Sequence, residues 1–211
     1  MSDPSHPKVA QPDHEILDVI RHRWSPRAFN ASEDVPHGDL QRLFEAARWA
    51  PSSRNEQPWR FVVTERRRTP DAFAALLSSA TPKNQAWAAA APVLVLVTVR
   101  ANHEAIEVAN PHAWYDAGQA VAFLTLQATA AGLSVRQMQG FDAAVARQVC
   151  AVPAPFEPAV IMAIGFAGDP ATLTVAGHRE AELTPRIRRS LTEFVFEGVW
   201  GNSWAEEERS Y

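Results

Sequence analysis

The sequence has little cysteine and no long apolar run. Cys150 is the one cysteine among 211 residues, so no disulfide can form within the chain. This is typical of proteins in a reducing compartment, and we expect a cytoplasmic location and a packing role for Cys150 rather than a nucleophilic one. The most apolar stretch, residues 86–99, contains Pro92 and is shorter than the roughly 20 apolar residues that cross a bilayer. We therefore expect no membrane partner.

Motifs of several enzyme classes are missing. No G-x-G-x-x-G follows a predicted strand and no Walker loop is present, which argues against a Rossmann nicotinamide site and a P-loop. The seven histidines show no H-x-x-x-H or H-E-x-x-H spacing, so nothing supports a metal site. The absence of G-x-S-x-G argues against a serine hydrolase. A net charge of only -4 gives no reason to expect nucleic acid as a partner.

The composition that remains is that of an ordinary folded domain. Hydrophobic residues make up 46% of the chain and charged residues 21%, which is enough apolar surface for a core. We expect a flexible arm over residues 1–12, one domain over residues 13–200 and a tail over residues 201–211. The aromatic residues Trp204 and Tyr211 of this tail either dock on another subunit or pack on their own domain.

Apolar periodicity and helix-boundary residues predict the secondary structure. The predicted helices cover residues 13–21, 36–50, 71–79, 84–91, 115–131 and 142–150. The predicted strands cover residues 61–64, 93–99 and 159–165, and residues 186–196 start extended and then turn helical. Residues 93–99 are a continuous run of β-branched residues and leucine, which indicates a strand covered on both faces. The order of elements predicts an α+β or mixed α/β sandwich.

Two arginine clusters lie far apart in the sequence. Residues 23–29, R-W-S-P-R-A-F, place two arginines around a serine just after a predicted helix. Arg186 and Arg188 alternate in an extended segment, so their side chains point the same way. Guanidinium groups match phosphate oxygens in geometry and charge. Each cluster alone is also typical of a solvated basic surface.

Two polar loops lie beside predicted helices and strands. Residues 47–61, A-R-W-A-P-S-S-R-N-E-Q-P-W-R-F, join a helix that ends at Pro51 to a strand that begins after Pro58. A polar loop fixed on both sides suits recognition of a polar ring edge, although it is also an ordinary connection. In residues 137–142, Q-M-Q-G-F-D, Gly140 allows close approach of the backbone to a ligand, and the following helix start favours electron-rich atoms.

Taken in order, these four segments resemble the motifs of the nitroreductase family of FMN enzymes. The family patterns are R-x-S-x-R/K-x-F, A-P-S-S/A-x-N-x-Q-P-W-x-F, G-L followed by G-F-D, and R-x-R-x-x-L, and the resemblance spans about residues 13–200. It implies an α+β sandwich with a mostly antiparallel central sheet flanked by helices. It also implies a homodimer with FMN at the subunit interface.

The same resemblance implies an activity. NADH or NADPH would supply electrons, and a small acceptor such as a nitroaromatic or quinone would receive them by a ping-pong mechanism. No catalytic side chain is expected, because N5 of the flavin carries the chemistry. The alternatives are a flavoenzyme of the same fold with a different reaction (dehalogenation, enone reduction or dehydrogenation) and an FMN-binding protein without turnover.

The resemblance further assigns flavin contacts to residues of this chain. The phosphate ligands that it implies are Arg23, Arg186 and Arg188, and the neighbours of the phosphate or the ribityl chain are Trp24 and Ser25. Arg27 matches the family's cation near the N1/O2 edge of the flavin. The loop that reaches the flavin from the partner subunit contributes Pro51, Ser52, Ser53 and Asn55. A backbone N–H near N5 is expected in the segment Met138, Gln139 and Gly140.

Some positions depart from the family pattern. Gln139 stands where many relatives carry an acidic residue, so we expect a changed flavin potential or proton supply. A second basic or amide residue is often found at the pyrimidine edge, and Asn84 is the candidate, with Lys83 as the alternative. Residues 101–114 are expected to form part of a lid, in which His103 and His112 are either proton donors or surface histidines.

Overall fold

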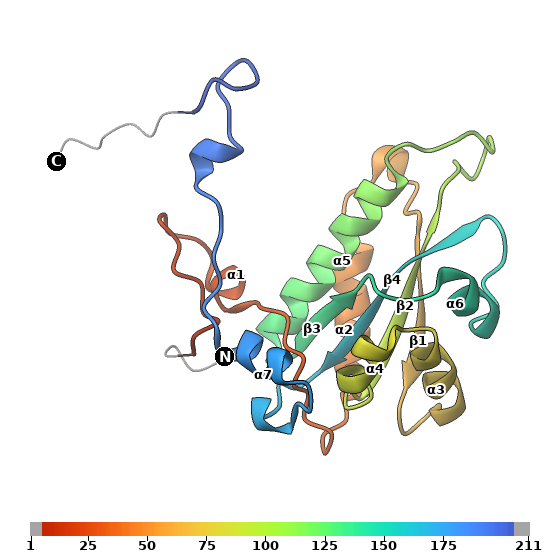
Figure 1. Cartoon of the computed structure of the whole chain (residues 1–211). Helices are drawn as coiled ribbons and strands as arrows, with labels where there is room; N and C mark the ends of the chain where they lie inside the picture. The colour runs from red at the N-terminus through yellow and green to blue at the C-terminus, as the bar shows by residue number, and fades with distance from the viewer. Residues whose placement is uncertain (1–5, 205–211) are drawn as a thin grey trace.

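A four-stranded antiparallel sheet forms the centre of the computed structural model, which describes residues 6–204 (Figure 1). The strand order is β1-β2-β4-β3, and every neighbouring pair is antiparallel. The strands are β1 (Trp59–Glu65), β2 (Val93–Arg100), β3 (Ser134–Met138) and β4 (Phe156–Gly165). The expected sandwich with a central antiparallel sheet is thus confirmed, and β3 is an edge strand that was not among the predicted strands.

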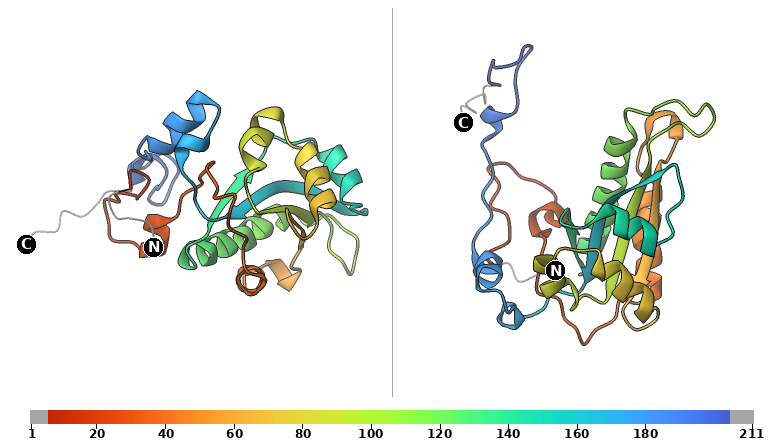
Figure 2. Two further views of the ribbon diagram at one scale, coloured as in Figure 1. Left: turned by 90° about the horizontal axis from the view of Figure 1, so that it is seen from below. Right: turned by 45° about the vertical axis from the view of Figure 1, so that its right-hand side comes forward.

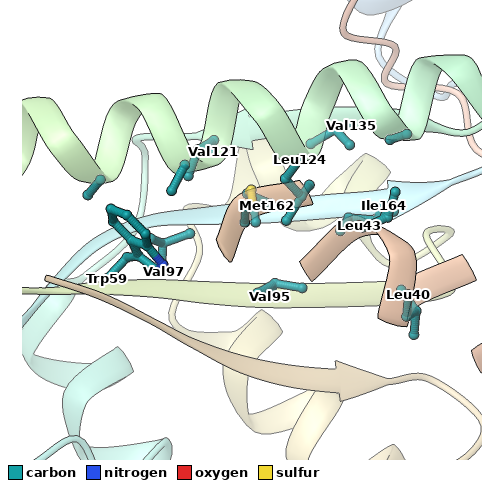
Figure 3. Packing of buried hydrophobic residues seen from close by; sticks show 14 of the residues in the cluster. Leu40, Leu43, Trp59, Val95, Val97, Val121, Leu124, Val135, Met162 and Ile164 are labelled. Atoms are coloured by element: carbon teal, nitrogen blue, oxygen red, sulfur yellow. The ribbon is translucent and has the colours of Figure 1, made fainter. Parts of the chain in front are cut away.

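Helices cover both faces of this sheet (Figure 2). One face carries α2 (His37–Arg48) and α5 (Ala113–Ala130), and the other carries α3 (Pro70–Ser78), α4 (Pro82–Ala88) and α6 (Ala143–Val149). All five were predicted, with boundaries that differ by a few residues. The first core packs Leu43 of α2 and Leu124 of α5 against the sheet (Figure 3). Small buried residues such as Ala120 let these two helices approach closely.

The apolar sequence of β2 follows from its position between two cores. Val93, Val95, Val97 and Val99 belong to the core below α2 and α5. Leu94 and Leu96 point the other way and pack with Phe73 and Trp87 of α3 and α4. Because side chains of a strand alternate between faces and both faces are covered, all of these positions are apolar.

The first and last parts of the described chain differ from prediction. The helix expected over residues 13–21 is reduced to α1 (Asp18–His22), which buries no residue. Its apolar residues Leu17 and Ile20 stay 69% and 41% exposed, so packing does not stabilise a longer helix. Residues 186–196 contain only a 3-10 turn, η3 (Leu191–Glu193). Helix α7 (Ala176–Leu183) was not predicted, nor were the turns η1 (Ser53–Asn55) and η2 (Pro170–Thr172).

Residues 184–204 run beside the N-terminal segment and away from the sheet (Figure 1). Arg186 donates to the carbonyl of Arg21 at 2.8 Å, and Lys8 donates to the carbonyl of Thr184. Trp200 is 91% exposed. Residues 1–5 of the expected arm and 205–211 of the expected tail, including Tyr211, lie outside the described residues.

Within residues 6–204, no helix is long and apolar enough to cross a membrane. The same described part of the chain holds no group of three or more His, Cys, Asp or Glu side chains that could bind a metal ion. Cys150 packs at the margin of the core below α3, α4 and α6, and burial raises the pKa of its thiol.

Candidate active site

The three arginines expected at a phosphate lie together. The Arg186 guanidinium donates to the carbonyl of Arg23, and Arg23 in turn donates to Ser25 Oγ at 3.0 Å. Burial lowers the pKa of Arg186, and the charges of Arg23 and Arg188 lower it further. Burial and Arg188 likewise lower the pKa of Arg23. No ion pair to a carboxylate joins any of the three among residues 6–204, so this cluster is an excess of positive charge suited to an anion.

Trp24 lies in this segment but packs elsewhere. Its ring is 5.0 Å from that of His6, centroid to centroid. It also lines a hollow of about 550 Å³ with His22, Leu133 and Phe166, between α1 and the end of α5. Its side chain therefore supports the N-terminal segment beside the arginine cluster, and the expected ribityl contact stays a prediction.

Arg27, four residues after Arg23, is held by a buried carboxylate. Glu182 of α7 is 1% exposed, and its two oxygens accept the backbone N–H of Arg27 at 3.0 and 3.1 Å. One of these oxygens also lies 3.7 Å from Arg27 Nη1. Glu182 was missed because α7 buries polar residues instead of an apolar stripe. The carboxylate fixes both the backbone and the charge of Arg27.

Arg136 of β3 joins this second positive centre. Its guanidinium donates to the carbonyl of Ser25 and lies 5.3 Å from the centroid of the Trp87 ring. Burial lowers the pKa of Arg136 to about 10, the charge of Arg27 acts in the same direction, and Glu182 opposes both. The only signal in the sequence was an arginine between the Gly132-Leu133 and Gly140-Phe141 motifs.

A hydrogen bond joins the side chain of Asn84 to the backbone of Gly140. The carbonyl of Gly140 accepts from Asn84 Nδ2 at 3.0 Å and from the backbone N–H of Thr81 at 2.9 Å. A Cβ at position 140 would lie 2.9 Å from Asn84 Nδ2, so the close approach requires glycine. Asn84 Oδ1 accepts from Trp87 Nε1 at 3.3 Å. Both ends of the Asn84 amide are therefore engaged in holding the segment that contains Met138, Gln139 and Gly140.

The start of α6 does not offer its N–H groups to a ligand. The Asp142 carboxylate caps the helix by accepting from the backbone N–H groups of Ala144 and Val145 at 2.9 and 3.0 Å. The electron-rich group at this helix start is therefore the carboxylate of Asp142 itself. Any donor toward a flavin must come from the loop before Asp142.

The loop over residues 51–58 is fixed from within the protein. The backbone N–H of Ser53 donates to the carboxylate of Asp116, a residue of α5 that is 3% exposed, at 2.9 Å. Ser52 Oγ accepts from the backbone N–H of Gln57 at 3.0 Å. Asn55 has a φ of 58°, in the left-handed region. Pro51 and Asn55 are exposed, so a rigid polar loop faces outward.

This loop and the arginines lie at opposite corners of the sheet. Trp59, directly after the loop, pairs with Val99 at one end of β2. Phe29, directly after the arginine segment, bridges Ala167, which lies just beyond β4 at the Val93 end of β2. Six residues separate the two ends of β2, about 20 Å at 3.3 Å per residue. Within this single chain, the polar loop and the arginines predicted to contact the flavin are not brought together.

The expected lid residues lie next to this loop. His103 Nδ1 is 3.2 Å from Glu56 Oε1, and the backbone N–H of Glu104 donates to Glu56 at 3.1 Å. The Glu104 N–H is the main cause that lowers the pKa of Glu56, and His103 adds to it. His112 precedes α5 as its N-cap residue. Residues 101–112 are thus attached to residues 51–58, and their function as a lid stays a prediction.

Comparisons with known proteins identify the family of the chain. The model of the nitroreductase family matches residues 20–166. The chain is 32% identical over 169 residues, 71% of this chain and 85% of the relative, to a Burkholderia lata protein named "Putative NADH dehydrogenase/NAD(P)H nitroreductase". It is 35% identical over 149 residues, 68% of this chain and 98% of the relative, to an uncharacterised 15.4 kDa protein of Mycolicibacterium smegmatis.

Solved structures show the same fold. The crystal structure of an oxidoreductase containing FMN superposes with a TM-score of 0.84 at 30% identity, over 92% of this chain and 96% of that one. A Desulfovibrio desulfuricans protein, described as a "putative nitroreductase in complex with fmn", superposes with a TM-score of 0.69 at 25% identity, over 90% of this chain and 99% of that one. Sequence and fold together show that the chain belongs to the nitroreductase family.

Proposed function

We propose that this protein is an FMN-dependent oxidoreductase that takes electrons from NADH or NADPH and passes them to a small acceptor such as a nitroaromatic or quinone. One observation carries the proposal. Two positive centres, around Arg23 and around Arg27, stand at the two ends of a segment that spans at most about 14 Å. FMN likewise carries two electron-rich ends, its phosphate and its N1/C2=O edge, joined by the ribityl chain. The family membership supports the same cofactor.

The first centre suits the phosphate. Burial is the main cause that lowers the pKa of Arg23 and of Arg186, and the charge of Arg188 lowers both pKa values further. An anion with two negative charges relieves this repulsion and accepts charge-assisted hydrogen bonds. The hydroxyl of Ser25, 3.0 Å from Arg23, lies where it can donate a further bond. These four residues would hold the phosphate.

The second centre suits the pyrimidine edge. Arg27 is fixed in position by Glu182, so it can stabilise negative charge at N1/C2=O without rearranging. The segment of Met138, Gln139 and Gly140, held by Asn84 and Thr81, would present a backbone N–H to N5. When bound, FMN supplies the hydride acceptor and donor, and the chain needs no nucleophilic side chain.

A homodimer completes each site in this proposal. Pro51, Ser52, Ser53 and Asn55 lie about 20 Å along the sheet from their own arginines, so the loop of a second copy would reach the flavin. Large exposed apolar side chains support association: Trp49 next to this loop is 68% exposed and Tyr115 of α5 is 72% exposed. In residues 184–204, Ile187 and Trp200 are 85% and 91% exposed.

We further propose that donor and acceptor bind in turn over the same flavin face. The sequence holds no motif for a separate nicotinamide domain, which favours one shared pocket. Parallel double-reciprocal plots at several acceptor concentrations would support ping-pong kinetics. Intersecting plots would show that both substrates bind together and would refute this part of the proposal.

The experiment that tests the function begins with the purified protein. Its absorbance spectrum and FMN content are measured, and NADH or NADPH is then mixed with it anaerobically in a stopped-flow instrument. We expect close to one FMN per subunit, bleaching with one or both nucleotides, and recovery when a quinone or nitroaromatic is added. Absence of FMN refutes the proposal, and bound FMN that no nucleotide reduces refutes the NAD(P)H activity.

A further inference from the structure

The positive centre around Arg27 contains further cations besides Arg27 itself. Arg136 reaches the same place from β3. Lys8 lies nearby: burial is the main cause that lowers its pKa, and the charges of Arg27 and Arg136 lower it further. Glu182 is the one carboxylate that acts on the pKa of Arg136 or Lys8. Its two oxygens already accept the backbone N–H of Arg27, and one of them also accepts the N–H of Ala28. An electron-rich ligand is therefore needed to balance the charge.

The position of Arg136 points it toward the same surface as α4. Side chains of a strand alternate, and Met138, two residues later, is buried with Trp87 in the core on the α4 face. The Arg136 guanidinium lies 5.3 Å from the Trp87 ring and donates to the carbonyl of Ser25. Ser25 lies between the two arginines of the 23–27 segment. Arg136 is thus anchored beside Arg27 from a rigid strand, and not from a loop.

The residues expected at this position serve other purposes. Asn84 gives its Nδ2 to the Gly140 carbonyl and its Oδ1 to Trp87, so its amide holds the loop. Lys83 is exposed on α4, and its charge acts on His178 of α7. Of the candidate cations, only Arg136 combines partial burial with a fixed hydrogen bond to the segment that carries Arg27.

We propose that Arg136 is the second cation at the pyrimidine edge of the flavin, beside Arg27, and that Glu182 is a positioning residue that holds Arg27 there and reduces the positive charge of the pair. This inference rests on the proposed FMN function. Two cations at N1/C2=O stabilise the reduced, more negative flavin over the oxidised one. The pair thereby makes the bound flavin easier to reduce, and Glu182 moderates this effect.

The test measures the affinity of the full-length protein for oxidised FMN and the midpoint potential of the bound cofactor. We expect Arg136→Met to weaken binding of reduced FMN about tenfold more than binding of oxidised FMN, which lowers the potential by about 30 mV for a two-electron couple. Arg136→Lys restores most of the potential because it keeps the charge. Glu182→Gln shifts the potential in the opposite direction.

Two further variants serve as controls. Lys83→Met tests the alternative cation, and Arg67→Met removes an exposed charge that pairs with Asp34 away from this centre. We expect neither to change the potential. A shift with Lys83→Met and none with Arg136→Met overturns the proposal. Equal loss of FMN in Arg136→Met and Arg136→Lys, with an unchanged potential for the flavin that remains, also overturns it by showing a purely structural role.

The outcomes separate this inference from the function on which it rests. Arg27→Met is the reference, because Arg27 is the cation that the proposed function already places at N1/C2=O. A shifted potential in Arg27→Met without one in Arg136→Met leaves the function intact and refutes the role of Arg136. Wild-type protein that takes up no FMN refutes the function itself. If Arg136→Met does not fold, the midpoint potential of Glu182→Gln tests the proposal instead. An unchanged or lower potential in this variant contradicts the argument that Glu182 reduces the positive charge of the pair.

Discussion

The carboxylate of Glu182 lies 3.0 Å from the backbone nitrogen of Arg27, although 155 residues separate the two in the sequence. This contact joins α7 to the segment that carries the arginines. Because the carboxylate is 1% exposed and accepts backbone N–H groups, it acts as a fixed buried anchor and not as a surface ion pair. In the proposed site, the position of the flavin edge relative to its phosphate would therefore depend on α7.

Glu182→Ala should destabilise the apoprotein by about 2 kcal/mol, because it leaves the backbone N–H groups of Arg27 and Ala28 without their acceptor. Urea unfolding, followed by far-UV circular dichroism, measures this change. Glu180→Ala, an exposed glutamate on the same helix, is the matched control and should change stability by less than about 0.5 kcal/mol. Equal effects of the two substitutions would mean that the anchor has no special energetic role.

Gly140→Ala should weaken FMN binding by about tenfold. The added Cβ would lie 2.9 Å from Asn84 Nδ2, so the 3.0 Å hydrogen bond to the Gly140 carbonyl must lengthen and the loop must shift. Fluorescence titration of the apoprotein with FMN gives the dissociation constant. In the control Gly38→Ala, nothing lies within 4 Å of the new Cβ, and helix propensity predicts equal or slightly higher stability. Unchanged FMN affinity in Gly140→Ala contradicts the tight packing described for this loop.

Complementation between two defective chains tests the shared site. One variant carries Arg23→Ala and Arg188→Ala, and the other carries Ser53→Pro, which removes the N–H that Asp116 accepts. Each alone should bind little FMN. After the two are unfolded together and refolded, random pairing in a two-fold dimer should restore about a quarter of the wild-type sites. No recovery above the separate variants argues that each site is built by one chain.

The pH dependence of stability should contain a contribution from His178. Burial lowers the pKa of His178, and the charges of Arg27, Lys83 and Arg136 lower it further. As the pH falls, His178 is therefore protonated more readily in the unfolded chain than in the folded one. This has no effect on stability well above about pH 6.5, and it lowers stability as the pH drops through that value. The pKa of His178 is lowered even though Glu182 lies one turn further along α7.

Thermal unfolding between pH 7.5 and 5.5 measures this contribution. We expect the melting temperature of wild type to fall over this range more steeply than that of His178→Gln, which cannot titrate. His37→Gln removes an exposed histidine and should follow the wild-type slope. Identical slopes for wild type and His178→Gln would show that the histidine does not contribute.

Much of the fold could be predicted because its signals are local. The valines and leucines from Val93 to Val99 face two cores, and Thr98 is the one polar residue among them, so the strand is easily recognised. Helix α7 gave no such signal, because its buried residues His178 and Glu182 are polar and their partners lie far away in the sequence. Helix α1 was overestimated because Leu17 and Ile20 repeat at helical spacing without a core to cover them.

The candidate site was predicted only in part for the same reason. The arginines at 23, 186 and 188 stand in recognisable motifs, and the structure brings them together. Arg136 stands in a five-residue edge strand without a motif, and its relation to Arg27 depends on how β3 lies beside residues 23–27. The separation of the loop at 51–58 from the arginines follows from strand register, which the sequence does not display.

The proposed phosphate site consists of Arg23, Arg186 and Arg188, and all four strands of the sheet are encoded between Arg23 and Arg186. During synthesis, the ribosome therefore adds all four strands of the sheet before it adds Arg186 and Arg188. A nascent chain that ends after β4 contains every buried residue of the two cores but lacks Arg186 and Arg188. We therefore expect cofactor loading to be a late event in biogenesis, and we expect removal of residues 184–204 to release the flavin.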